Sequence, residues 1–167
     1  MIKVRVPATS ANLGPGFDTL GLALALYVQV ELDWSRDNII EFTGAGAQQI
    51  AGRAEHNLVW QAVNRVREVT GNNSPLKLSI HNDIPVGRGL GSSAAAIVAG
   101  LVSANQLLGE PLAEEEILAL AVEMEGHPDN IVPALKGGLT TAMLYNDQVY
   151  YQKLHLPTEM TVVVLVP

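Results

Sequence analysis

One glycine-rich run, preceded by a strand pattern and followed by an apolar helix pattern, constrains this chain more than any other feature. The run is IPVGRGLGSSAAA, residues 84–96. Before it, Leu76–His81 alternates apolar and polar side chains as a half-buried strand does, and after it residues 93–108 predict a helix. The glycines allow backbone angles that side chains forbid and let the main chain approach a ligand closely. We therefore expect a strand, a tight loop and a helix in immediate succession.

This loop predicts a phosphate-binding site. Ser92 or Ser93 is expected to cap the helix, whose first free N–H groups and positive dipole end favour a bound anion. Two common phosphate-binding patterns do not match, because the run lacks a GK[ST] ending and its glycine spacing is not GxGxxG. The alternative, for the run taken alone, is a turn before a well-capped helix that binds nothing.

The rest of the chain alternates strand and helix patterns irregularly. Strands are expected at Lys3–Val6, Leu20–Trp34, Asn38–Thr43, Leu139–Tyr145, Val149–Leu154 and Thr161–Val166. Helices are expected at Leu58–Val69 with Asn57 as its cap, from Glu114 to Gly126, and from His127 to Leu135. Hairpin-like strand pairs near both ends favour an α+β fold, in which helices are layered on one face of a mainly antiparallel sheet. With no linker or repeat in the sequence, one domain accounts for the whole chain.

The carboxyl end predicts that the chain is part of a longer protein. Met160–Pro167 is rich in β-branched residues and almost entirely apolar, which is typical of a strand buried on both faces. A chain that stops inside such an element either adds it to a sheet built upstream or continues beyond it. We expect the second.

Composition and charge exclude several classes of protein. The net charge is −7 with ten Lys plus Arg and no cationic cluster, which argues against a nucleic-acid partner. The absence of cysteine rules out disulfides and thiolate metal sites. No apolar run approaches the roughly 20 residues of a membrane span, and the amino terminus lacks an apolar signal core. We expect a soluble cytoplasmic protein that binds small molecules or other proteins.

Two further segments are unusually polar. PATSANLGPGFDTLG, residues 7–21, combines Thr9, Ser10, Asn12 and Asp18 with glycines and prolines, and its alternative interpretation is a surface turn. EMEGHPDN, residues 123–130, gathers carboxylates, one histidine and an amide after a helix. Its spacing matches no zinc signature, so the choice is between a hard-cation site, such as one for Mg²⁺, and a solvated acidic helix end.

Together the three segments resemble the GHMP small-molecule kinases, named for galactose, homoserine, mevalonate and phosphomevalonate. PVGRGLGSSAAA is similar to the ATP-binding motif of that superfamily, whereas PATSANLGPGFDTLGLAL and EGHPDNIVPALKGGL are similar to its homoserine kinases. The first motif lacks the GEHTD-like string of galactokinases and the lysine with GEH of mevalonate kinases. The resemblance implies a ribosomal protein S5 domain 2-like fold over residues 1–167, with the carboxyl-terminal GHMP domain absent from this chain.

The resemblance also implies that ATP and Mg²⁺ bind along the glycine loop. Asn57 would lie near the adenine, and the residues around the phosphates would be Pro85, Val86, Gly87, Arg88, Gly89, Leu90, Gly91, Ser92, Ser93, Ala94 and Ala95. Ser93, or alternatively Ser92, would hold Mg²⁺ together with Glu125, while Glu123 would face solvent. Arg88 would contact either a phosphate or solvent.

An L-homoserine pocket is implied by the same resemblance. It would be lined by Asn12, Asp18, His127 and Asn130. Asp18 would meet the substrate ammonium, and Asn130 would lie near the attacking hydroxyl. Asn130, Asp129 and Glu125 would be the catalytic residues, with Asp129 as a candidate base. Neither the first motif nor the end of the glycine loop supplies a lysine for a lysine-assisted mechanism.

The implied function is ATP-dependent phosphorylation of L-homoserine to O-phospho-L-homoserine, in threonine biosynthesis. Two alternatives stay open: another GHMP kinase that acts on a different small alcohol, and a non-catalytic nucleotide-binding or association module. We expect little or no kinase activity from the 167-residue chain by itself. Its apolar terminal strand, left at a sheet edge, would favour pairing with another copy as a homodimer.

Overall fold

The computed structural model describes residues 1–50, 56–156 and 161–164. The strands are β1 (Ile2–Ala11), β2 (Leu20–Trp34), β3 (Ile39–Gly44), β4 (Leu76–Asn82), β5 (Leu139–Tyr145) and β6 (Gln148–Leu154). The helices are α1 (Ala47–Ile50), α2 (Leu58–Thr70), α3 (Ser92–Leu107), α4 (Glu114–Glu125) and α5 (Pro128–Lys136). None of the described helices is both long and apolar enough to cross a membrane.

The six strands form one sheet organised around the long strand β2. β1 runs antiparallel along one edge of β2, while β4 pairs with its second half and β5 with its first residues, both antiparallel. β6 extends the sheet beyond β5, and β3 lies beside β4 in the sheet's parallel pair. The sheet is therefore mainly antiparallel, as the sequence predicts.

Alternation of side chains explains which face of the sheet is buried. On β2, Val28, Val30 and Leu32 are at most 2% exposed, and the polar residues between them point to the opposite face. β4 repeats the pattern: its apolar residues are buried, whereas Lys77, Ser79 and His81 are half-buried or exposed. Both strands therefore contribute one apolar face to the core, and both were predicted from this periodicity.

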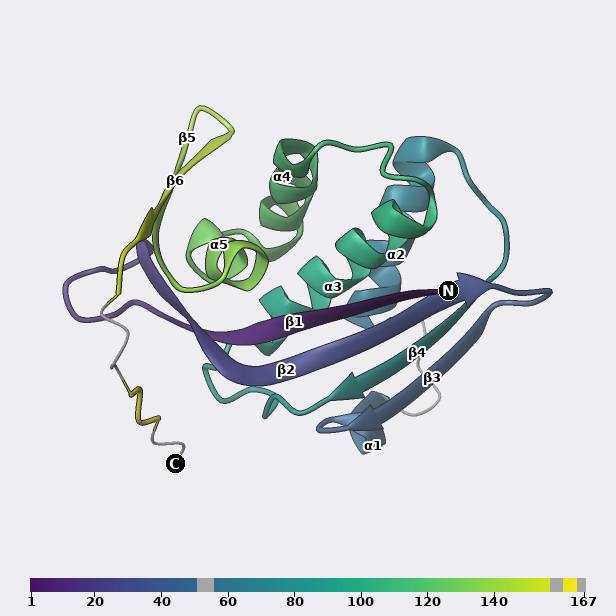
Figure 1. The fold of residues 1–167 in the computed structure, drawn as a ribbon, viewed down its shortest axis with the longest axis horizontal. Helices are drawn as coiled ribbons and strands as arrows, with labels where there is room; N and C mark the ends of the chain where they lie inside the picture. The colour runs from purple at the N-terminus through teal and green to yellow at the C-terminus, as the bar shows by residue number, and fades with distance from the viewer. Residues whose placement is uncertain (51–55, 157–160, 165–167) are drawn as a thin grey trace.

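Helices α2, α3, α4 and α5 all lie over the same face of the sheet (Figure 1). α3 is the central one: it packs on β1 and β2 and is itself covered by α2, α4 and α5. Consequently most of its side chains are buried, including Ile97, Val98 and Leu101. This arrangement confirms the predicted α+β architecture, with helices layered on one face.

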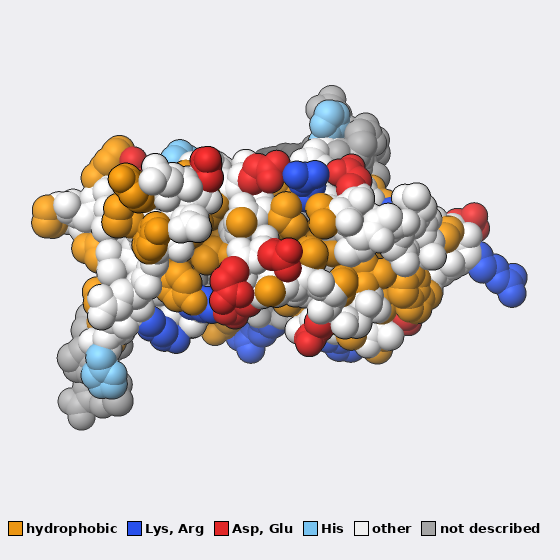
Figure 2. Space-filling view, turned by 90° about the horizontal axis from the view of Figure 1, so that it is seen from above, with side chains coloured by type: hydrophobic (Ala, Val, Ile, Leu, Met, Phe, Trp, Pro, Cys, Tyr) orange, Lys and Arg blue, Asp and Glu red, His pale blue; other side chains and the backbone are white. Residues whose placement is uncertain are grey.

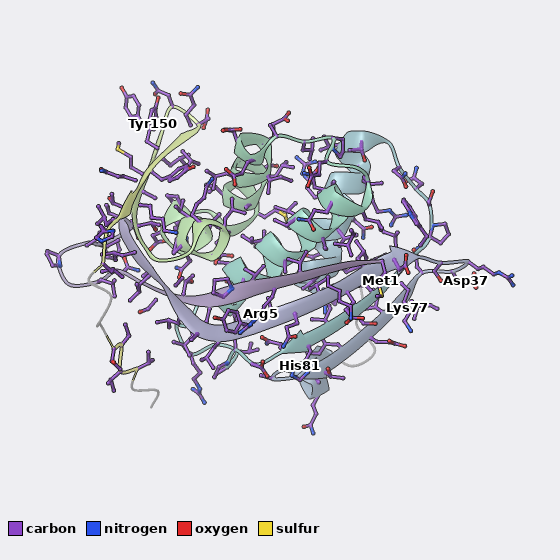
Figure 3. The ribbon with its side chains drawn as sticks, viewed as in Figure 1. Met1, Arg5, Asp37, Lys77, His81 and Tyr150 are labelled. Carbon is purple, nitrogen blue, oxygen red and sulfur yellow. The ribbon has the colours of Figure 1, made fainter. Side chains whose placement is uncertain are left out.

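The opposite face of the sheet is polar and held by cross-strand pairs. Lys77 and Ser79 of β4 both bind the Glu41 carboxylate of β3, at 3.0 Å and 2.8 Å. The Lys77 ammonium, and after it the Ser79 hydroxyl, lower the pKa of Glu41. Arg5, Lys77 and His81 lie on this side of the sheet, away from α2, α3, α4 and α5 (Figure 3). We conclude that this face is built to meet water.

The β5–β6 hairpin projects from the body of the molecule (Figure 1). Figure 2 shows hydrophobic side chains gathered at that end. The exposed apolar and aromatic residues of the hairpin are Met143, Leu144, Tyr145, Tyr150 and Tyr151. Only the first three residues of β5 pair with β2, so the tip of the hairpin stands clear of the main sheet.

One predicted strand boundary is wrong, and one predicted strand is not formed where the structure describes it. β1 continues past Val6 to Ala11 through a register shift at Pro7/Ala8. Pro7 is tolerated because β1, within the described residues, pairs only with β2, and an edge strand can lack one N–H. The strand expected at Thr161–Val166 is not formed at residues 161–164, where Val163 is 90% exposed and none of the described strands pairs with the backbone. Met160 and residues 165–167 lie outside the described residues.

Gly100 provides a test of how closely α3 packs on α2. A Cβ atom at this position would lie 2.4 Å from the Val59 carbonyl oxygen and 2.7 Å from the Ala62 Cβ. In an exposed helix a Gly→Ala change stabilises by about 1 kcal/mol. Here we expect Gly100→Ala to destabilise by about 1–3 kcal/mol, because the two helices must move apart. Urea denaturation measures the change.

Gln106→Ala, at an exposed position of the same helix, is the control and should shift the free energy of unfolding by less than about 0.5 kcal/mol. A Gly100→Ala protein as stable as the parent would contradict the close helix contact.

Candidate active site

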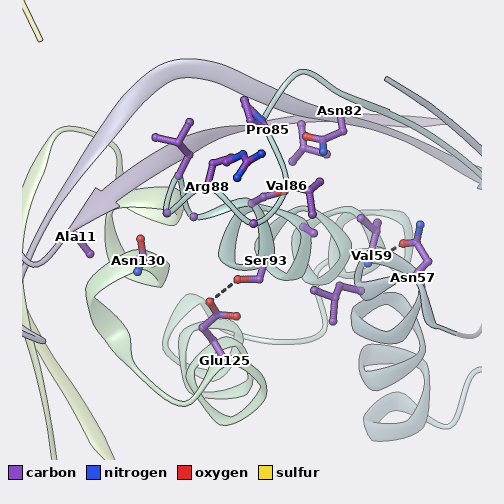
Figure 4. Close-up of a pocket in the computed structure, with 18 of the residues that line it drawn as sticks. Ala11, Asn57, Val59, Asn82, Pro85, Val86, Arg88, Ser93, Glu125 and Asn130 are labelled. Atoms are coloured by element: carbon purple, nitrogen blue, oxygen red, sulfur yellow. Dashed lines mark hydrogen bonds between the residues drawn. The ribbon is translucent and has the colours of Figure 1, made fainter. Parts of the chain in front are cut away.

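A pocket of about 660 Å³ opens where the glycine loop meets α3 (Figure 4). Its walls come from the end of β1, the loop after β4, the first turns of α2 and α3, the last residue of α4 and the start of α5. Segments far apart in the sequence therefore meet at this one place. All three segments singled out in the sequence contribute to it.

Within the loop, residues with a positive backbone φ alternate with residues that have none. Gly87, Gly89 and Gly91 have φ values of 70°, 69° and 60°, whereas Arg88 and Leu90 between them have no positive φ. Alternation of this kind turns successive N–H groups toward one side and forms a concave site for an anion. The loop thus has the backbone shape that a phosphate requires.

Two buried polar residues fix the position of the loop. The Asn82 side chain donates to the carbonyl oxygens of Ala45 and Ile84 and accepts from the Ile84 N–H, at 3.0–3.1 Å. The Thr9 N–H, at the end of β1, donates to the Leu90 carbonyl oxygen at 3.1 Å. The loop is therefore held from both neighbouring strands of the sheet.

The amino terminus of α3 has no side-chain cap. Gly91 occupies the cap position, and neither Ser92 nor Ser93 bonds back to the helix, so the predicted serine cap is wrong. The first intrahelical bond runs from the Ala95 N–H to the Gly91 carbonyl at 2.9 Å. A capping side chain would occupy the very amides that an anion needs. With none present, these amides lie beside the pocket.

Ser93 and Glu125 face each other across the pocket floor. Ser93 Oγ donates to Glu125 Oε1 at 2.6 Å, and both side chains are half-buried (Figure 4). The carboxylate at Glu123 points elsewhere, pairing with Arg65 at 3.0 Å on the surface. The structure thus brings the two predicted metal ligands, Ser93 and Glu125, together, whereas Glu123 lies on the surface outside the pocket lining.

Asn130 lies on another wall, in the first turn of α5. Its Oδ1 accepts the hydroxyl proton of the fully buried Thr9 at 2.8 Å. Its own N–H is bound by the Asp129 carboxylate at 3.0 Å. The Asn130 side chain is thereby anchored to β1, and its backbone is bound by the neighbouring Asp129.

Asn57 caps α2 as predicted. Its Oδ1 accepts from the Val59 and Trp60 N–H groups at 2.9 Å and 3.2 Å, and Gly71 ends the helix in the left-handed conformation. Asn57 also lines the pocket, but its side chain is only 2% exposed. Next to it the wall is largely apolar, with side chains from Val28, Phe42, Leu58, Val59 and Ala96.

Comparison with known proteins now identifies the family. The profile described as GHMP kinases N terminal domain matches residues 57–138. A homoserine kinase of Carboxydothermus hydrogenoformans is 51% identical over 169 residues, and one of Petrotoga mobilis is 46% identical over 168; each match covers all of this chain and 55% of the relative. The crystal structure of a homoserine kinase from Cytophaga hutchinsonii, at 36% identity, has a TM-score of 0.77 over 93% of this chain and 52% of its own.

The chain belongs to the GHMP kinase family. It spans about half the length of the curated relatives that it matches. The resemblance inferred from three short motifs is thus confirmed over the whole chain.

Most of the residues predicted for a GHMP kinase site line the pocket. They are Asn12, Asn57, Pro85, Val86, Gly87, Arg88, Gly89, Leu90, Gly91, Ser92, Ser93, Glu125 and Asn130. Ala94 and Ala95 do not, because they are buried inside α3. Asp18 and His127 are exposed outside the lining, and Asp129 is 2% exposed beneath it.

Sequence reasoning did not identify the supporting residues of this GHMP kinase domain. Thr9 was noted only as a polar loop residue, and Asn82 was not singled out, although both hold the loop. The signal for Thr9 was its place shortly after the strand expected at Lys3–Val6. The signal for Asn82 was an amide between the strand and the glycine run, where Asn favours turns.

The donor set at the pocket suits magnesium better than a transition metal. Among the described residues, no three His, Cys, Asp or Glu side chains gather as a metal site. Mg²⁺ commonly takes only one or two protein oxygens and completes its shell with water and phosphate. The Ser93 hydroxyl and the Glu125 carboxylate, next to a loop whose backbone is shaped to bind a phosphate, meet that requirement.

Gly91 and Gly89 form a matched pair for testing the contact between the loop and β1. Both have a positive φ, but a Cβ at Gly91 would lie 1.8 Å from Thr9 Oγ1, whereas a Cβ at Gly89 would have no atom within 4 Å. We expect Gly91→Ala to lower the free energy of unfolding by about 1–3 kcal/mol more than Gly89→Ala does, since backbone strain is common to both. Urea denaturation without nucleotide measures it; equal losses would refute the contact.

Proposed function

We propose that the whole protein is an ATP-dependent homoserine kinase and that this chain is its amino-terminal domain. The proposal draws on curated relatives named homoserine kinase, which match the entire chain at 51% and 46% identity. The observation that carries it is the uncapped end of α3 beside the left-handed glycines, with the Ser93–Glu125 pair next to them. This combination provides both an anion site and a cation site within one pocket.

ATP would bind with its phosphates along the loop and its base at the apolar wall. The amides from Val86 to Ser93 would surround the β- and γ-phosphates, and Arg88, exposed at the rim, would add a positive charge. Phe42, Leu58 and Val59, next to Asn57, offer the adenine an apolar surface. Mg²⁺, held by Ser93 and Glu125, supplies positive charge that neutralises the phosphate oxygens.

Homoserine would lie on the side of the pocket formed by Asn12 and Asn130. Asn12 accepts the Asp18 N–H at 2.7 Å, which keeps the Asp18 carboxylate near this side for the substrate ammonium. His127 directly precedes α5 and would contribute from its exposed position. Asn130 would contact the substrate hydroxyl.

In the proposed reaction the substrate hydroxyl oxygen bonds to the γ-phosphorus, the bond to the β–γ bridging oxygen breaks, and ADP and a proton are released. Phosphoryl transfer depends mainly on positioning and charge neutralisation. Of the residues predicted to be catalytic, Glu125 and Asn130 line the pocket. Asp129 is buried and binds the Asn130 N–H, which suits a supporting residue better than the base first considered.

We also propose that the protein acts in the cytoplasm, where ATP and amino acid precursors are available, and that it pairs as a homodimer. The exposed apolar residues of the β5–β6 hairpin support pairing better than residues 161–164, which form no strand. Sedimentation of the full-length protein measures the oligomeric state.

A substrate panel tests the function. We expect the full-length protein to release ADP with homoserine at least a hundredfold faster than with mevalonate, galactose or shikimate, because a site that hydrogen-bonds polar substrate groups rejects analogues lacking them. Preference for another alcohol would favour a different GHMP kinase. Mg²⁺-dependent ATP binding without turnover of any alcohol would favour a non-catalytic module.

The 167-residue chain should be nearly inactive by itself. It spans 55% of the length of the homoserine kinase relatives, and we expect the remaining half of the protein to complete the substrate site. Turnover of homoserine by the short chain should be below about one hundredth of the full-length rate, since misplaced groups reduce phosphoryl transfer by that order. Comparable rates for the two would show that one domain suffices.

Glu125 and Glu123 allow a controlled test of the metal site. We expect Glu125→Gln to lower kcat about a hundredfold or more and to raise the Mg²⁺ concentration needed for half-maximal rate, because a charged ligand is lost. Glu123→Gln removes the same charge two residues away, where the carboxylate pairs with Arg65, and should change kcat less than about twofold. Equal effects would mean that net charge, not coordination, matters.

A further inference from the structure

The side-chain amide of Asn130 is held with a defined polarity. Its Oδ1 accepts the Thr9 hydroxyl proton at 2.8 Å, and Thr9 is fully buried. The oxygen and nitrogen of an amide diverge from the same planar carbon, so with Oδ1 on Thr9 the Nδ2 atom is directed to another side. With Oδ1 bound by this buried hydroxyl, the other polar atom of the amide, Nδ2, is left to face the pocket.

The free end of this amide is accessible. Among the described residues, Asn130 Nδ2 has no hydrogen-bond acceptor, and no buried side-chain nitrogen or oxygen lacks a partner. Nδ2 is therefore not buried. Since Asn130 lines the pocket, its two N–H groups are available there as donors.

The glycine loop makes room for this pair of side chains. A Cβ at Gly91 would lie 1.8 Å from Thr9 Oγ1 and 3.1 Å from Asn130 Oδ1. The backbone of Thr9 also binds the loop, through its N–H and the Leu90 carbonyl. Thr9 thus joins the substrate-side amide to the phosphate-side loop.

We propose that Thr9 is a positioning residue, which holds Asn130 as a hydrogen-bond donor toward the substrate hydroxyl oxygen. This inference rests on the proposed kinase function. A donor on that oxygen occupies one lone pair and orients the other toward the γ-phosphorus, while the hydroxyl proton stays free to leave. An amide turned the other way would instead accept that proton and hold it.

A double-mutant cycle in the full-length protein tests the proposal. We expect Thr9→Val, which keeps the shape but removes the hydroxyl, to lower kcat about tenfold to a hundredfold. The KM for ATP should change less than about twofold, because the Thr9 backbone still binds Leu90. Thr9→Ser keeps the hydroxyl and should retain kcat within about threefold. In an Asn130→Ala background, Thr9→Val should have almost no further effect.

An equal loss from Thr9→Val in both backgrounds would overturn the proposal, because Thr9 would then act independently of Asn130. Equal losses from Thr9→Val and Thr9→Ser would also overturn it, since the hydroxyl would not be the active feature. Thermal unfolding of each variant separates these effects from loss of the fold.

The orientation can also be measured without turnover, which separates this proposal from the identity of the substrate. If another alcohol is the substrate, the same cycle is run with it. If no alcohol is phosphorylated, the proposed function fails, and the Asn130 side-chain ¹⁵NH₂ signals, assigned by their loss in Asn130→Ala, still report the amide. Thr9→Val should shift these signals and Thr9→Ser should not; unchanged signals in Thr9→Val would refute the positioning role.

Discussion

Burial of α3 between the sheet and three other helices is the constraint on which the site depends. Ile97, Val98 and Leu101 are at most 1% exposed, and Gly100 leaves no space for even a methyl group against α2. A helix packed in this way can neither slide nor rotate without opening the core. The packing of α3 therefore fixes its first backbone amides next to the glycine loop and Glu125. No group in the pocket is needed to hold them in place.

The site departs from locally favourable structure where a ligand would bind. α2, away from the loop, has an asparagine cap and a glycine stop, whereas α3 has a glycine in the cap position and no side-chain cap. Three residues of the loop before α3 have a positive φ. Such departures are expected at functional positions, where stability is given up for an exposed set of amides.

Local signals explain what could be predicted from the sequence. α2 and its cap and the alternation of β2 and β4 follow from spacing, and the proximity of Ser93 and Glu125 follows from motif resemblance. The Thr9–Asn130 bond could not be foreseen, because it joins positions 121 residues apart and depends on β1 continuing past Pro7. The strand expected at Thr161–Val166 is not formed at residues 161–164 for a related reason. Apolar β-branched residues favour a strand, but the strand forms only when another strand pairs with it.

The short connection between α4 and α5 links the two halves of the proposed chemistry. Glu125 ends α4 and Asn130 lies in the first turn of α5, with Gly126 at φ 97° forming the turn between them. Both helices pack on α3, so the carboxylate and the amide are fixed relative to the same amino terminus. A displacement of this turn would move the proposed metal ligand and the proposed substrate contact together. Binding of the metal and of the alcohol are for this reason expected to be energetically coupled, each favouring the turn geometry that the other requires.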